Sequence, residues 1–478
     1  MLTRLEADGF KNLLGFELDL GPYTCIAGPN AVGKSNIFDA VEFLSLLADH
    51  PFMEAAQRLR SHGSRGTDPR TLFWQQDDEQ AGPARLRLAA EMIVPPQVTD
   101  DFGRRAEATT TFLRYELELE YQPSSSLGLH QPGRIVLLSE KLRHINRGEA
   151  VAHLAWPHGK AKFRDVVVVG RRSGTAYIST DQDADGNNVV NVHQDGGSRG
   201  KPRRSPAASA PRTVISTTTT SDYPTILVAR REMQQWRMLA LEPSAMRAPD
   251  LASGPNRIQP DGSHLAAALY RLAGRDPETV YARVSADASA LTDVREVTVD
   301  FDHQRELLTL EARIGAGPML PARALSDGTL RFLALCIIGI DQDFGGVICM
   351  EEPENGIHPA KIASMVDQVK RLAVDPTESP SQENPLRQVI VNTHSPYFVA
   401  FQDVDDLLVA VPTSIKRVGS QEPATTVRCL PMVKSWRAAS APMPSPMPVT
   451  LDIIVDYLRT PRDAVLQLEL PYAELGTA

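Results

Sequence analysis

The fold is decided by the stretch Gly28-Pro29-Asn30-Ala31-Val32-Gly33-Lys34-Ser35, which matches the pattern G-x-x-x-x-G-K-[ST] at every fixed position. Residues 23–27 before it are apolar enough to form a short buried strand, and residues 36–44 after it have the apolar stripe of a helix. Such a turn binds anions, because backbone N–H groups close around phosphate oxygens and the helix dipole favours negative charge. The alternative is a glycine-rich turn that binds nothing.

Residues of this stretch have distinct expected roles in binding ATP. We expect Lys34 to reach the β- and γ-phosphates and the Ser35 hydroxyl to hold Mg²⁺. The other nucleotide contacts are expected from Gly28, Asn30, Gly33 and Asn36.

An acidic strand end is expected to complete the metal site. Residues 346–350 are apolar and are followed by Glu351 and Glu352, at the carboxyl end of a predicted strand, where ligands bind in such sheets. We expect Glu351 to hold Mg²⁺, mostly through water, and Glu352 to polarise the attacking water as general base. Most hydrolytic phosphate-loop proteins carry aspartate at the first position, so Glu351 departs from the wider pattern. A surface turn before Pro353 is the alternative.

Two more polar positions follow the same logic. Ser326, Asp327 and Gly328 begin a predicted helix, in which Ser326 is a good N-cap and Gly328 lets the backbone approach a ligand. This segment is either a second phosphate-binding helix start or an ordinary capped helix. His394 ends another predicted buried strand and is expected to hydrogen-bond a γ-phosphate, the alternative being a structural histidine.

The order of four motifs along the chain resembles that of an ABC-type ATPase. These motifs are the Walker A pattern, an LSGGQ-like helix start, hydrophobic-Glu-Glu-Pro-Glu and Thr-His-Ser-Pro. The first two lie far apart in the chain, which resembles the RecF, SMC and OLD-like branch rather than transporter ATPases. Residues 351–359 are similar to OLD-related AAA family ATPases of bacterial anti-phage defence loci, and Phe10-Lys11-Asn12 resembles the opening hairpin of that branch. The resemblance covers about residues 1–48 and 320–411.

This resemblance implies an α/β fold, an ABC-type P-loop ATPase core with a mixed sheet and helices, assembled from both ends of the chain. It implies a homodimer that sandwiches ATP, in which Ser326-Asp327-Gly328 of one subunit caps the nucleotide held by Lys34 of the other, with a higher assembly left open. Such an arrangement is self-complementary under a two-fold axis. His358 is a candidate dimer contact and equally a structural turn residue, and Gln75 or Gln76 are candidates for the Q-loop glutamine.

Four segments follow from these boundaries. Residues 1–48 and 320–411 are the two halves of the predicted core, 49–319 an insertion that is β-rich to about residue 195 and then loop and helical, and 412–478 a C-terminal extension. Alternating polar and apolar residues within 84–195 predict antiparallel strands, whereas the helix–strand rhythm after 325 predicts parallel ones.

Several minor segments also carry predictions. Residues 165–169 alternate and are predicted to be a strand. Residues 181–186 imitate a calcium loop but lack the glutamate at its twelfth position, so a hairpin turn is preferred. Residues 194–213 are predicted to be a mobile loop, and residues 450–458 an amphipathic helix. The basic residues of the loop, which are either solvated or contact nucleic acid or an acidic partner, are Arg199, Lys201, Arg203, Arg204 and Arg212.

The composition is that of an ordinary globular protein. The 478 residues are 42% hydrophobic and 23% charged, with a formal net charge of −9, so bulk charge does not indicate nucleic-acid binding. The four cysteines lie far apart and are expected to be core thiols in a reducing compartment. We expect no signal peptide and no membrane span, hence a cytoplasmic protein.

We therefore expect an ATPase that dimerises on ATP and regulates a separate effector, a nuclease or toxin, in antiviral defence. The chain after His394 holds no acidic cluster suited to the two metals of OLD nucleases, and there is no coiled coil. One alternative is a RecF-like DNA-repair ATPase that binds duplex DNA directly. Another is a nucleotide-sensing scaffold that does not hydrolyse ATP.

Overall fold

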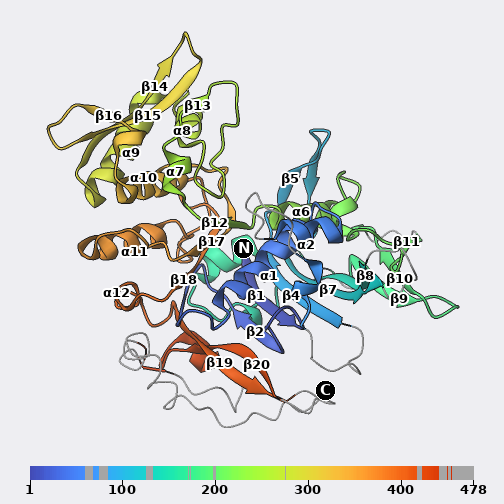
Figure 1. Ribbon diagram of the computed structural model, residues 1–478. Helices are drawn as coiled ribbons and strands as arrows, with labels where there is room; N and C mark the ends of the chain where they lie inside the picture. Colours follow the sequence, from blue (N-terminus) through green and yellow to red (C-terminus); the bar gives the residue numbers. More distant parts are fainter. Residues whose placement is uncertain are drawn as a thin grey trace.

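The computed structural model describes most of the chain (Figure 1). The described residues are 1–59, 68–74, 84–124, 133–170, 172, 174–196, 201–274, 276–416, 423–440, 449–450 and 454. Gln75, Gln76 and Arg199 lie outside them, as does nearly all of the helix predicted near 450–458.

The largest sheet has eight strands, and every neighbouring pair in it is antiparallel. Its order is β11-β10-β9-β8-β7-β4-β1-β2. The bounds are β1 (Leu2–Asp8), β2 (Phe16–Asp19), β4 (Ala84–Ile93), β7 (Phe112–Gln122), β8 (Arg134–His144), β9 (Ile178–Gln182), β10 (Asn188–Val192) and β11 (Arg203–Pro206). The opening hairpin and the antiparallel strands predicted between 84 and 195 therefore belong to one continuous sheet.

A second sheet of six strands carries the phosphate-loop strand at its centre. Its order is β12-β17-β18-β3-β19-β20, parallel except for the last pair. The bounds are β3 (Tyr23–Ala27), β12 (Arg237–Leu239), β17 (Gly346–Glu351), β18 (Arg387–Thr393), β19 (Leu407–Ile415) and β20 (Ala424–Pro431). Strands from both ends of the chain meet here, and β12 from the middle of the chain extends the edge.

Helix α1 (Lys34–Leu47) lies between the two sheets (Figure 1). Its apolar residues share one core with inward residues of both sheets, and that core includes Phe38, Phe43, Leu88, Val347 and Ile390. The opposite face of the six-stranded sheet packs in a second core against α10 (Asp327–Ile340) and α11 (Ile362–Arg371). The loop that precedes α1 is thus held by a helix that is buried from both sides.

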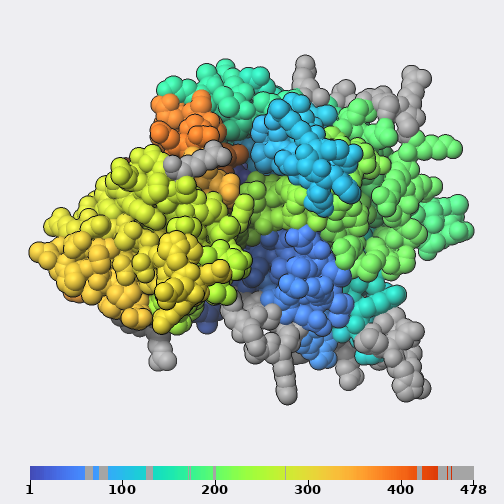
Figure 2. Space-filling model, turned by 90° about the horizontal axis from the view of Figure 1, so that it is seen from above, coloured from blue at the N-terminus to red at the C-terminus, as the bar shows by residue number. Residues whose placement is uncertain are grey.

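A smaller lobe projects from this body, as the gold part of Figures 1 and 2 shows. It contains β13 (Asp250–Leu251), β14 (Val294–Asp302), β15 (Leu307–Ile314) and β16 (Met319–Pro321), packed with α8 (Leu265–Ala273) and α9 (Pro277–Leu291). Figure 2 shows a hollow between the lobe and the segments coloured blue.

The remaining elements are short. The helices are α2 (Phe52–Arg58), α4 (Ala150–His153), α5 (Asp165–Val167), α6 (Pro224–Met233), α7 (Pro243–Met246), α12 (Pro396–Val399) and α13 (Trp436–Ser440), and Lys160–Arg164 form a π-turn. Single 3-10 turns are formed by Pro69–Leu72, Ile215–Thr217, Ala322–Ala324 and Pro359–Lys361, and β5 (Gln97–Thr99) pairs with β6 (Arg105–Glu107).

Most predictions about the elements are confirmed, and two are wrong. The predicted fold class is confirmed, because the chain is an α/β protein whose central mixed sheet carries helices. The hairpin turn between β9 and β10 is confirmed as well. Residues 165–167 are helical rather than extended, because they continue the turn begun at Lys160. The loop predicted over 194–213 contains β11, whose backbone pairs with the edge strand β10 although its side chains are polar.

Two further predictions concern the state of the cysteines and the length of the helices. All four cysteines are free thiols, and three of them are buried. Among the described helices, none is long and apolar enough to cross a membrane.

Candidate active site

The chain between β3 and α1 forms a tight anion-binding turn. Ala31 and Gly33 have φ angles of 65° and 109°, in the left-handed region. A Cβ on Gly33 would lie 2.4 Å from the Asn12 amide nitrogen, and a Cβ on Gly28 would lie 2.8 Å from the Ala410 carbonyl oxygen. Gly28 is therefore required by its close approach to the backbone of Ala410, and Gly33 by its backbone angle.

Lys34 lies at the centre of this turn. Its side chain is buried, and Nζ donates hydrogen bonds to the carbonyl oxygens of Gly28 at 2.6 Å and Pro29 at 2.7 Å. Burial lowers the pKa of Lys34, and the charges of Glu352 and Glu351 oppose that shift. A desolvated ammonium group held by two carbonyls is well suited to exchange one of them for a phosphate oxygen.

The tip of the opening hairpin braces the turn from the other side. The Asn12 amide donates to the Val32 carbonyl at 3.3 Å and accepts from the Asn36 amide at 2.8 Å. Lys11 forms an ion pair with Asp39 of α1. Asn12 was not expected to be a site residue, because a contact between a hairpin tip and a loop twenty residues away leaves no trace in a local pattern.

The two glutamates at the end of β17 face the same cavity as Lys34 and Ser35. The cavity measures about 340 Å³, and Glu351, Glu352, Asn30 and Asn36 also line it. Successive strand residues point to opposite faces, so the shared direction needs a turn. Glu352 provides that turn with φ of 46°, and its N–H donates to the Asn392 carbonyl at 2.9 Å.

Hydrogen bonds fix both carboxylates. Glu352 accepts from the Asn355 amide at 2.9 Å, and its other oxygen lies 2.6 Å from Nδ1 of His394. The Asn392 amide donates to Glu351 at 3.2 Å. His394 therefore reaches the cavity through Glu352, whereas Asn392 lines it directly, an assignment that the sequence reading missed.

Behind them, Glu354 is buried and accepts a hydrogen bond from the Thr393 hydroxyl. Burial raises the pKa of Glu354. Its neighbour Asn355 connects the acidic turn to α10, because the Arg331 guanidinium donates to the Asn355 carbonyl oxygen.

The predicted second phosphate-binding segment is elsewhere. Ser326 and Asp327 are exposed, and the described residues that line the cavity do not include them or Gly328. The Ser326 hydroxyl caps α10 by accepting from the Thr329 N–H at 3.2 Å, and Asp327 forms an ion pair with Arg247. Within one chain, this segment therefore does not line the cavity that contains Lys34.

The cavity fits a nucleotide phosphate and a magnesium ion. Gly33 has a φ angle of 109° that residues with a side chain rarely adopt, and the Ser35 hydroxyl and Glu351 carboxylate supply the oxygen ligands that Mg²⁺ prefers. No group of three or more histidine, cysteine, aspartate or glutamate side chains within the described chain could hold a metal ion.

A family model described as "AAA domain, putative AbiEii toxin, Type IV TA system" matches residues 247–400. The matched region contains α10, the acidic end of β17 and His394. A search of curated proteins finds no match.

Three solved structures that resemble the chain are heads of SMC proteins. The SmcHead bound to the C-winged helix domain of ScpA is 14% identical, with a TM-score of 0.41 over 91% of this chain and 99% of that chain. The SMC head domain from Thermotoga maritima is 11% identical, with a TM-score of 0.33 over 90% and 98%. The Smc head domain with an extended coiled coil bound to the C-terminal domain of ScpA derived from Pyrococcus furiosus is 11% identical, with a TM-score of 0.38 over 90% and 96%.

Proposed function

We propose that the protein is an ABC-type ATPase that binds ATP with Mg²⁺, dimerises on it and hydrolyses it. The observation that carries the proposal is the convergence of Lys34, Ser35, Glu351 and Glu352 on one cavity. A buried lysine beside a helix start binds phosphate, and a hydrogen-bonded carboxylate facing it is the group that hydrolysis requires. The AAA-domain match across residues 247–400 supports the same assignment.

Each side chain has a defined part in the proposed reaction. Lys34 would bind the β- and γ-phosphates, and Ser35 and Glu351 would hold Mg²⁺, which neutralises phosphate charge when bound. Glu352 would accept a proton from the attacking water. His394, 2.6 Å from Glu352, would orient that carboxylate and sense the γ-phosphate, while Asn355 holds its other oxygen.

The exposed start of α10 supports a dimer in which each subunit completes the site of the other. Ser326, Asp327 and Gly328 lie outside the cavity of their own chain, and the first two are exposed. Under a two-fold axis, the segment of one subunit would cap the nucleotide held by its partner, and the reverse. ATP would thus favour the closed dimer and hydrolysis would release it.

The biological role is proposed from resemblance alone. We propose that the ATP-driven dimer regulates a separate effector protein, a nuclease or a toxin, in antiviral defence, and that it works in the cytoplasm. A RecF-like ATPase that binds duplex DNA directly is the second candidate. It is favoured by the exposed side chains of Arg203 and Arg204 on the edge strand β11.

The test is ATP turnover and mass in solution, with and without ATP, for the wild type and Glu352→Gln. We expect the variant to lose turnover by about 100-fold or more, because general bases contribute 10²–10⁴-fold, and to gain ATP-dependent dimer. Turnover that survives the substitution would exclude Glu352 as the base. A wild type without turnover would favour a non-hydrolysing scaffold. Glu118→Gln, on the exposed side of β7, is the matched control.

A further inference from the structure

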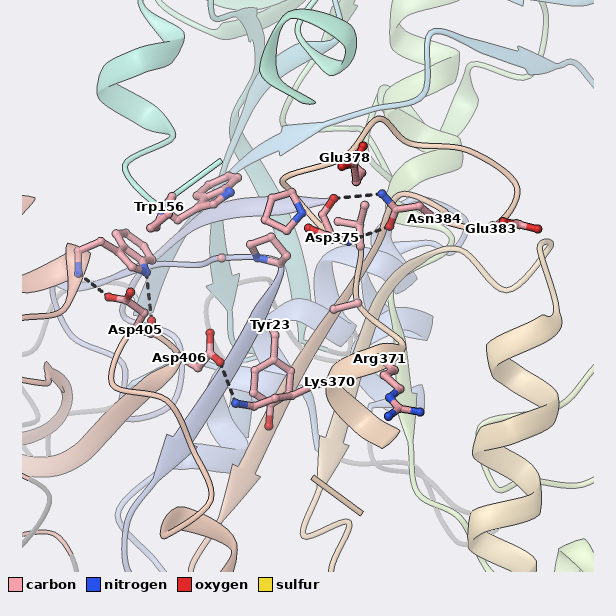
Figure 3. A pocket seen from close by; sticks show the side chains of 17 residues that line it. Tyr23, Trp156, Lys370, Arg371, Asp375, Glu378, Glu383, Asn384, Asp405 and Asp406 are labelled. Atoms are coloured by element: carbon pink, nitrogen blue, oxygen red, sulfur yellow. Dashed lines mark hydrogen bonds and ion pairs between the residues drawn. The ribbon is translucent and has the colours of Figure 1, made fainter. Parts of the chain in front are cut away.

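A second, larger cavity lies at the opposite end of the six-stranded sheet from the phosphate loop. It measures about 690 Å³. Tyr23, the first residue of β3, lines it, whereas the phosphate loop follows the last residue of the same strand. Segments far apart in the chain meet there, and Figure 3 shows the side chains of Trp156, Asp375, Glu383 and Asp405 around the space. We call this cavity the inter-sheet groove.

Two tryptophans form one side of the groove. Trp156 and Trp436 lie edge to face with ring centroids 6.4 Å apart. Trp156 is only 3% exposed, and among the described residues its indole Nε1 has no hydrogen-bond partner. Figure 3 shows this nitrogen on the side of the ring that faces the groove. A buried N–H donor without an acceptor is unfavourable, so the wall lacks one acceptor.

Most of the charged residues in the lining are acidic. Its carboxylates are Asp375, Glu378, Glu383, Asp405 and Asp406, against the cations Lys370 and Arg371. Lys370 is already held between Asp403 at 2.7 Å and Asp406 at 3.1 Å, so it does not offset the remaining acids.

The remaining carboxylates differ in how many ion pairs and hydrogen bonds they make. Glu378 pairs with Lys162 at 2.8 Å, and one oxygen of Asp405 accepts from the Trp436 N–H at 2.9 Å. Glu383 is exposed and makes no ion pair with any described residue. Asp375 likewise makes no ion pair with a described residue, and neither does the lining cation Arg371. The unpaired carboxylates of the lining, Asp375, Glu383 and Asp405, therefore outnumber its unpaired cation.

We propose that the inter-sheet groove binds a short peptide segment of a partner protein that carries arginine or lysine. One cationic side chain would lie beside the Trp436 ring and be met by Asp405, and a second would be met by Glu383, which Figure 3 shows on the opposite side of the groove. A backbone carbonyl of the peptide would accept from the Trp156 indole. A nucleotide or another anion is disfavoured by the charge of the lining. A single small amine would fill little of a cavity this size and leave the indole unpaired.

This proposal is independent of the proposed ATPase activity, because the groove contains none of the residues that line the phosphate-loop cavity. The two sites are connected only through the sheet and through α11, whose last turn carries Lys370 and Arg371.

The test uses the full chain and a fluorescein-labelled synthetic peptide with two arginines between prolines, followed by fluorescence anisotropy. A peptide with glutamates in place of the arginines is the negative probe. We expect the arginine peptide to bind and Glu383→Lys to weaken it by about tenfold, because the change replaces an attraction with a repulsion. Trp156→Phe, which keeps a smaller aromatic ring and removes the N–H donor, is expected to weaken it by about threefold or more.

Controls separate a site from general attraction to a chain of net charge −9. Glu118→Lys makes the same change in charge on β7, outside the groove, and is expected to leave affinity within about twofold. Circular dichroism and thermal unfolding report that each variant is folded, and we expect both to match the wild type. Equal effects of Glu383→Lys and Glu118→Lys, equal binding of the glutamate peptide, or no binding of the arginine peptide to the folded wild type would each overturn the proposal.

Discussion

The N-termini of α1 and α10 differ in whether a side chain of the protein caps them. Within the described chain, no side chain caps α1, whose N-cap is Gly33, and its first residues face a cavity. Helix α10 is capped by its own Ser326, and Asp327 in its first turn is paired with Arg247. The first therefore offers free N–H groups to an anion, whereas the second has already satisfied one of them.

This difference indicates an order of events. A phosphate can bind at α1 using residues of one chain only, because Lys34 and the backbone of the turn are in place. A ligand at α10 must use the Ser326 hydroxyl or displace a cap that contributes about 1 kcal/mol to helix stability. We therefore expect ATP to bind first at α1, and α10 to act only when a second chain brings a nucleotide to it.

The largest expected effect is on ATP binding at α1. Lys34→Ala should weaken ATP binding by about 100-fold, because it removes a buried charge that would form charge-assisted hydrogen bonds to phosphate. Calorimetric titration with Mg-ATP measures it, and Lys141→Ala, an exposed lysine on β8, should leave affinity unchanged. Retained ATP affinity in a folded Lys34→Ala protein would remove the distinction between the two helix starts.

The second effect separates capping from binding. Gly328→Arg should lower turnover and ATP-dependent dimer by about 30-fold through steric exclusion of the partner's nucleotide, while ATP affinity of the single subunit stays within about twofold. The site tolerates a side chain, because an added Cβ would come only within 3.4 Å of Ile357. Steady-state turnover and the mass from analytical ultracentrifugation in the presence of ATP measure these two effects. Gly148→Arg, where an added Cβ meets nothing within 4 Å, is the control. Weaker ATP binding by the isolated subunit would contradict the separation.

The two regions also differ in how far the sequence predicts them. The turn around Lys34 is a contiguous pattern between a strand and a helix, so its geometry follows from local sequence alone. Asn12 and Asn392 could not be predicted as lining residues, because a hairpin tip and a neighbouring strand bring them to the cavity through tertiary packing. At α10 the local pattern predicts the cap of Ser326, but not the pairing of Asp327 with Arg247 from another segment.

The predictions for two short segments were wrong for a related reason. Five residues at 165–169, four of them valine, are too few to separate a strand from a single helical turn, and here the preceding turn favours the helix. Strand β11 is formed by backbone pairing with an edge strand, which polar side chains neither require nor prevent.

A smaller effect is expected at the connection between the two regions. Asn355 holds Glu352 through its amide at 2.9 Å and is held by Arg331 of α10 through its carbonyl. Asn355→Ala should lower turnover by about fivefold, since it removes one hydrogen bond that orients the base, and should leave ATP binding unchanged. Steady-state kinetics measure it, with Asn187→Ala in the exposed β9–β10 turn as control. An effect confined to ATP affinity would indicate that Asn355 contacts nucleotide instead of positioning Glu352.

The smallest effect is expected at Arg247. Its ion pair with Asp327 is partly exposed, so it contributes at most about 1 kcal/mol, and Arg247→Ala should weaken the ATP-dependent dimer by about two- to threefold. The measurement is the dimer dissociation constant in the Glu352→Gln background, where hydrolysis does not interfere. Arg305→Ala, which removes a more exposed arginine from the β14–β15 turn, is the control.

Whether Arg247→Ala weakens or tightens the ATP-dependent dimer also shows how the Ser326 cap acts. Arg247 donates to the Leu325 carbonyl at 3.1 Å as well as pairing with Asp327, so it fixes the backbone just before Ser326. If that fixed backbone presents the Ser326 hydroxyl to the partner's nucleotide, removal of Arg247 weakens the dimer, as we expect. A tighter dimer would show instead that the ion pair competes with the nucleotide for the start of α10, and that opening this cap limits closure.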